Sequence, residues 1–176
     1  MSEAIATTRH WLEKIVIGLN LCPFAERPYL DQRIGYVDCN GNSVDDVYRE
    51  FIALLERLLL PPQPVDTALL IVTTGLEDFG GYLDTLALLE DSIDKAGLAD
   101  VIQVASFHPD YCFDGVAPDD PANFSNRSPY PMFHLIRQDL LEEVLSRYPD
   151  PEKIPERNVA RLRELGNARI RALLED

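Results

Sequence analysis

Basic residues, cysteines and long apolar runs are scarce in this chain of 176 residues. Lysine and arginine number 16 against 30 acidic residues, which gives a formal net charge of −14. A chain this acidic repels a phosphate backbone unless its few cations gather on one face, so we expect no nucleic-acid partner. No segment approaches the roughly 18 apolar residues of a membrane span, so no membrane partner is expected either.

The three cysteines, Cys22, Cys39 and Cys112, form no CxxC pair. An odd number of separated cysteines indicates neither a disulfide framework nor a zinc knuckle, so free thiols are expected. The first residues also lack the basic stretch and apolar run of a secretion signal. Together these features predict a cytoplasmic protein.

Apolar residues are plentiful, at 46% of the chain, which is enough for one sizeable core. The continuous apolar run Thr67–Thr74 is typical of a strand that is covered on both faces. The remaining spacing predicts helices at about 4–20, 43–58 and 78–97, and further strands at 33–39 and 101–107. Thr67–Thr74 is expected to be the central strand, with 33–39 and 101–107 beside it in parallel.

This alternation predicts a single α/β domain over residues 1–176, with helices packed on a small, mainly parallel sheet of about three strands. A loop of about twenty residues follows the third strand. Two more helices are expected at about 131–148 and 155–174, so that residues 148–176 form a helical C-terminal extension. A ferredoxin-like α+β arrangement is the alternative, and it requires a fourth strand that the pattern does not supply.

The candidate site begins where the third strand ends. His108 and Asp110 follow that strand directly, at the carboxyl edge where open parallel sheets bind their ligands. On the expected helix 131–148, His134 and Arg137 fall on the apolar side with Phe133. A buried arginine requires a carboxylate, backbone carbonyls or an anionic ligand. The internal candidates for that carboxylate are Asp110, Asp114 and Asp119.

The segment before this helix offers polar groups that suit a small carboxylate or phosphate compound, on Asn126, Arg127, Ser128 and Tyr130. With Arg137, these residues form the predicted pocket for a small anionic molecule. We therefore expect His108, Arg127, His134 and Arg137 to converge on one cavity at the carboxyl edge of the sheet.

Catalysis in such a pocket would fall to a few residues. His108 and His134 are the acid–base candidates, Asp110 orients an imidazole, and Cys22 is a candidate nucleophile. The structural alternatives are that His108 holds its own loop and that Cys22 is a buried core residue. His108, His134 and Asp110 also have the composition of a facial metal triad, but no short ligand spacing supports one, so no metal is predicted. The sequence does not indicate a particular cofactor.

Three strings resemble a bacterial family known as domain of unknown function 1415. They are Leu19–Ala25 (LNLCPFA), Gln103–Tyr111 (QVASFHPDY), and Asn126–Met132 with His134–Arg137 (NRSPYPM, HLIR). The resemblance covers most of the chain. The family pattern usually has glutamine where this chain has Cys112, which argues against a catalytic role for Cys112, and glutamate where it has Gln138. The resemblance implies no particular activity.

The resulting hypothesis is an enzyme, of hydrolase or transferase type, that acts on a small anionic metabolite by histidine acid–base chemistry. The first alternative is a non-catalytic protein that binds a small ligand or a partner in the same pocket. The second is that two polar segments, Ser106–Tyr111 and Asn126–Pro131, only brace the fold, in which case Arg137 is paired within the protein.

Overall fold

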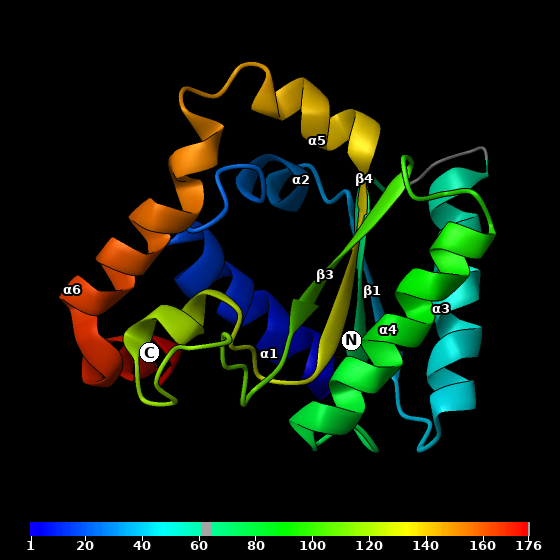
Figure 1. Cartoon of the computed structure of the whole chain (residues 1–176), viewed down its shortest axis with the longest axis horizontal. Helices are drawn as coiled ribbons and strands as arrows, with labels where there is room; N and C mark the ends of the chain where they lie inside the picture. The colour runs from blue at the N-terminus through cyan, green and yellow to red at the C-terminus, as the bar shows by residue number, and fades with distance from the viewer. Residues whose placement is uncertain (61–64, 176) are drawn as a thin grey trace.

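The chain folds around a mixed four-stranded sheet in the computed structural model, which describes residues 1–60 and 65–175 (Figure 1). The spatial order of the strands is β1-β2-β4-β3. Their bounds are Ile34–Cys39 for β1, Thr67–Val72 for β2, Ile102–Phe107 for β3 and Met132–Arg137 for β4. The α/β class is as predicted, but the sheet is mixed and has one strand more than expected.

The extra strand changes the centre of the sheet. β1 and β2 pair in parallel, as predicted for Thr67–Thr74 and its first neighbour. β3, the expected second neighbour of β2, lies at the edge instead, because β4 inserts between them and pairs antiparallel with both. The prediction of a helix from 131 was therefore wrong in its first part, and the helix that follows, α5, spans only Gln138–Leu145. The fourth strand that the ferredoxin-like alternative required does exist.

Two long helices cover one face of the sheet (Figure 1). Ser43 caps α3 (Val44–Leu59) and Asp78 caps α4 (Phe79–Lys95), each by accepting a hydrogen bond from a backbone N–H in the first turn. Gly97, at φ 70°, follows the end of α4, as the sequence predicts. The core on this face includes Phe51, Leu58, Leu70, Leu89 and Phe133, all at most 1% exposed.

The other face carries the N- and C-terminal helices (Figure 1). α1 (Glu3–Trp11) continues as a π-helix, η1 (Leu12–Ile17), and a short helix, α2 (Glu26–Leu30), precedes β1. α6 (Ile154–Glu175) follows a 3₁₀ turn, η3 (Pro151–Lys153), and contains a kink at Gly166, where φ is 74°. Leu69, Ile71 and Met132 are the strand residues of this second core.

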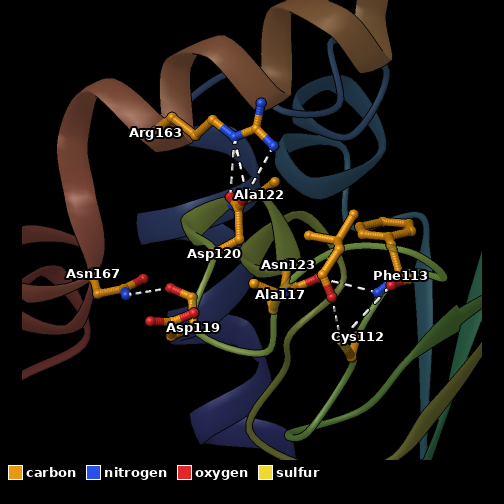
Figure 2. A network of polar contacts seen from close by, with 10 residues as sticks. Cys112, Phe113, Ala117, Asp119, Asp120, Ala122, Asn123, Arg163 and Asn167 are labelled. Carbon is orange, nitrogen blue, oxygen red and sulfur yellow. Dashed lines mark hydrogen bonds and ion pairs between the residues drawn. The ribbon is translucent and has the colours of Figure 1, made fainter.

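The long loop between β3 and β4 is anchored to α6 (Figure 2). It contains a 3₁₀ helix, η2 (Pro121–Ser125), which Asp120 caps. The Asp120 carboxylate also pairs with Arg163 of α6 at 2.8 Å, and the Asn167 amide donates to the Asp119 carbonyl at 2.7 Å. The loop is thus an ordered part of the second layer.

No helix within residues 1–60 and 65–175 is both long and apolar enough to cross a membrane.

Candidate functional site

A cavity of about 590 Å³ lies on the sheet face that carries α1 and η1. Its strand residues are Ile34 of β1, Thr67 and Leu69 of β2, Phe107 of β3, and His134, Ile136 and Arg137 of β4. Residues of α1, η1 and α5 and of the segment 22–33, together with Asp66 and Arg147, form the rest of its wall. The sequence predicted a site at the carboxyl ends of the parallel strands. This cavity lies instead toward the amino ends of β1 and β2.

His134 is the titratable histidine of this cavity. Its Nε2 lies 2.6 Å from Thr67 Oγ1, and the same hydroxyl donates to the Leu135 carbonyl at 2.6 Å. Because the Thr67 hydroxyl has one proton, which the carbonyl takes, Nε2 must carry its own proton and donate it to Thr67. The neutral ring therefore has its lone pair on Nδ1, for which the described part of the chain supplies no hydrogen-bond partner.

Burial sets the protonation state of this ring. His134 is half-buried, and Phe107 packs beside its imidazole with 6.2 Å between the ring centroids. Burial disfavours the imidazolium and lowers the pKa of His134 from 6.5 to about 4. The ring is thus neutral at pH 7, with Nδ1 as a proton acceptor.

Cys22 lies in the wall of the same cavity, in the segment between η1 and α2. Burial raises the pKa of its thiol, and the backbone N–H groups of Phe24 and Ala25 offset only part of that effect. The thiol is therefore protonated at neutral pH. A base must remove its proton before Cys22 can act as a nucleophile.

Arg137 reaches the cavity from the end of β4, where it is the N-cap residue of α5. Its guanidinium makes a bidentate contact with Asp139, with Nη2 2.5 Å from Oδ2 and Nε 3.1 Å from Oδ1. The three carboxylates proposed from the sequence, Asp110, Asp114 and Asp119, are not this partner. Arg137 also lowers the pKa of Asp139. The pair is asymmetric, since the arginine side chain is 17% exposed and the aspartate 62%.

The cavity wall contains a second ion pair, which was not predicted from the sequence. Arg33 and Asp66 meet in two contacts of 2.6 and 2.7 Å, and Asp66 N–H also donates to the Arg33 carbonyl. Each residue directly precedes a strand, β1 or β2. A usable signal was present, because parallel neighbouring strands begin side by side and bring such flanking charges together.

His108 is separated from His134 by the sheet. It is fully buried beside Phe79 and Tyr82, which belong to α4 on the other face. Its Nδ1 accepts from the backbone N–H of Asp110 and its Nε2 donates to the Leu76 carbonyl, each at 3.0 Å. These two bonds match the structural alternative for this histidine, in which it holds its own loop. Asp110 contributes its backbone here, and its side chain is exposed.

The other proposed ligand residues use their polar groups to hold the loop. Arg127 donates to the carbonyls of Tyr111 and Pro118, and Asn126 donates to that of Ser106. Ser128 donates to the Tyr130 carbonyl, and the Tyr130 side chain packs against the second core. The expected convergence of His108, Arg127, His134 and Arg137 on one cavity is therefore wrong: His134 and Arg137 line the cavity described above, while His108 and Arg127 do not.

In the described ranges, no three histidine, cysteine, aspartate or glutamate side chains lie close enough to hold a metal ion together.

Fold and cavity define a mixed α/β protein with a largely apolar cavity that contains a histidine, a thiol and several ion-paired arginines. The chain matches the family model described as "Protein of unknown function (DUF1415)" over residues 3–172, and it belongs to that family. No curated protein matches it, and no solved structure does.

Proposed function

We propose that the protein is an enzyme that binds a small anionic compound, a carboxylate or a phosphate, in the cavity beside β4 and transfers a proton at His134. One observation supports this proposal above the others. His134 lines a cavity of ligand size while Thr67 fixes its Nε2 proton, which leaves Nδ1 as an acceptor with no hydrogen-bond partner among residues 1–60 and 65–175.

An anionic ligand suits this histidine. When Nδ1 accepts a proton, an imidazolium forms in a buried site, and a nearby negative charge stabilises it. The ligand anion thus raises the pKa of His134 from about 4 toward neutrality, where a general base is most effective. Thr67 is a positioning residue in this scheme, because it holds the ring and its tautomer.

Arg137 is the proposed contact for the anion. Its present partner Asp139 is 62% exposed, so a ligand carboxylate can take over the guanidinium while Asp139 turns to solvent. Replacing Arg137 by methionine should weaken anion binding, yet change the free energy of unfolding by no more than about 1 kcal/mol, because it also removes the desolvation cost of a mostly buried guanidinium and leaves Asp139 exposed to water. Urea denaturation measures that second quantity.

Cys22 has a conditional role. If the reaction is a covalent group transfer, the Sγ proton of Cys22 passes to Nδ1 of His134 and the thiolate bonds to the electrophilic carbon of the substrate. The bond from that carbon to the leaving group then breaks, and the imidazolium gives its proton to the leaving group. The raised pKa of the free thiol means that Cys22 is unreactive without that transfer. A Cys22→Ser variant that keeps full turnover restricts the chemistry to His134.

The test is depletion of compounds from a mixture of small metabolites, followed by mass spectrometry. We expect the wild-type protein to consume an anionic compound and His134→Gln to leave it unchanged. Glutamine retains an amide that can donate to Thr67, but it lacks the imidazole base. Val44→Asn, a change in the first turn of α3 outside the cavity, is the control and should be fully active.

The alternative is a binding protein without turnover, and one observation favours it. Arg33 and Arg137 both already have carboxylate partners, and the Cys22 thiol is protonated, so no group is activated before a ligand arrives. In that case no compound is consumed, while wild-type and His134→Gln proteins retain the same ligand. If the wild-type protein neither binds nor consumes any compound, both proposed functions are rejected.

A further inference from the structure

We infer that the ligand of this cavity is a monoanion with a substantial apolar body, such as a medium-chain or aromatic carboxylate. The inference rests on the proposed function and specifies its substrate class. It is carried by the apolar wall of the cavity, by the exposed apolar side of α5 and by the balance of charges around the cavity.

The wall is mostly hydrocarbon. Leu12 and Val16 come from η1, Leu69 and Phe107 from the sheet, and Leu140 and Val144 from α5. A cavity of about 590 Å³ falls within the range of roughly 300 to 1,000 Å³ that encloses drug-sized ligands. Acetate or inorganic phosphate would leave most of this wall in contact with water.

α5 presents apolar surface that the protein itself leaves uncovered. None of its eight residues is buried, although Leu140, Leu141 and Val144 all line the cavity. Val144 is 41% exposed. Figure 1 shows α5 at the end of β4, on the same side of the molecule as α2, and both helices contribute to the wall. A ligand with an apolar body would remove this surface from water.

The charges in the wall favour a single negative charge on the ligand. Four arginines line it, Arg27, Arg33, Arg137 and Arg147, together with three carboxylates, Asp31, Asp66 and Glu143. All four arginines are nevertheless paired, because Arg137 contacts the exposed Asp139, so a ligand with one negative charge has to displace only that carboxylate. A polyanion would have to displace several of the existing ion pairs at once.

The experiment is isothermal titration calorimetry of the whole protein with butyrate, hexanoate, octanoate and 1-octanol. Each methylene that moves from water to an apolar wall should tighten binding by up to about fourfold. We expect octanoate to bind at least tenfold more tightly than butyrate, and 1-octanol to bind more weakly than octanoate.

A pair of matched variants assigns the binding to this cavity. Val144 in the cavity wall and Val44 on α3 are both helical valines that are 41% exposed. Val144→Asn should weaken octanoate binding several-fold, whereas Val44→Asn should leave it unchanged.

Each contrary result has its own meaning. Equal affinity for butyrate and octanoate overturns the apolar body and leaves the proposed function standing. Equal affinity for octanoate and 1-octanol overturns the anionic head, and with it the proposed function. Octanoate binding that Val144→Asn and Val44→Asn affect equally overturns the assignment to this cavity.

Discussion

His134 and His108 show how the environment of a histidine decides what it can do. Both nitrogens of His108 have backbone partners, so its ring has no free position for a ligand. His134 uses one nitrogen for Thr67, while the other lies beside a cavity and has no partner in the described part of the chain. The sequence predicted both as acid–base residues, because it contains no information on the hydrogen bonds that a ring makes after folding.

The lowered pKa of His134 makes stability depend on pH. The unfolded chain binds a proton at this residue near pH 6.5 and the folded protein only near pH 4, so the unfolded state gains protons first as pH falls. We expect the free energy of unfolding to decrease between pH 6.5 and 4, by no more than about 3 kcal/mol from this residue. Urea denaturation at pH 7 and pH 4.5 should show a smaller decrease for His134→Gln. Equal decreases would mean that His134 titrates normally.

His108 should matter for stability rather than for binding. A His108→Leu change strands the Leu76 carbonyl and the Asp110 N–H in a buried region. We expect a loss of roughly 1 to 3 kcal/mol in the free energy of unfolding, the usual cost of unsatisfied buried groups. Octanoate affinity, measured on the folded variant, should stay within twofold of wild type. A variant as stable as wild type would contradict the assignment.

Of the predicted site residues, Cys22, His134 and Arg137 do line one cavity. Asn126, Arg127 and Ser128 were proposed for the same pocket, but they donate to backbone carbonyls of β3 and of their own loop. Residue type alone could not distinguish the residues that line the cavity from those that hold the loop, because a guanidinium or an amide can serve either purpose. The distinction depends on the strand β4, which places His134 on one face of the sheet.

β4 was missed because its sequence has no alternation of polar and apolar residues. Phe133 and Leu135 pack on the α3–α4 side, while Met132 and Ile136 lie on the other, so both faces of the strand are apolar. The strand also passes directly into α5, whose helical spacing extends backward through it. By contrast, the caps Ser43 and Asp78 and the apolar run of β2 were sufficient to predict α3, α4 and the strand β2 itself.

The loop between β3 and β4 should depend on its anchor to α6. Asp120 both caps η2 and pairs with Arg163, so Asp120→Ala removes two constraints together (Figure 2). We expect backbone amides at 112–125 to exchange hydrogen faster by roughly fivefold or more, the size expected for a lost cap. Lys95→Met, which breaks an exposed pair within α4, is the control and should leave this loop unchanged. Unchanged exchange in Asp120→Ala would show that the loop is held by other contacts.

Across the whole molecule, the three cysteines lie in different surroundings and are all free thiols. Cys39 is 3% exposed in the first core, Cys22 lies in the cavity wall, and Cys112 donates to the Val116 carbonyl in the loop. Thiol titration of the unfolded protein without reductant should count three groups. In the native protein, octanoate should slow alkylation of Cys22 and leave that of Cys112 unaltered. A count of one would mean that a disulfide has formed.

The residues that line the cavity range from Trp11, near the start of the chain, to Arg147, in its last quarter. The cavity therefore depends on the complete fold. Nitrogen NMR of the His134 imidazole tests whether it is a working site, since the chain has only three histidines to assign. Without ligand, the ring should titrate near pH 4 and carry its neutral-state proton on Nε2. Saturating octanoate should raise that pKa by at least about one unit, as expected for a negative charge placed beside the ring. A ring that titrates near 6.5 without ligand, or a pKa that octanoate leaves unchanged, would contradict the proposed site.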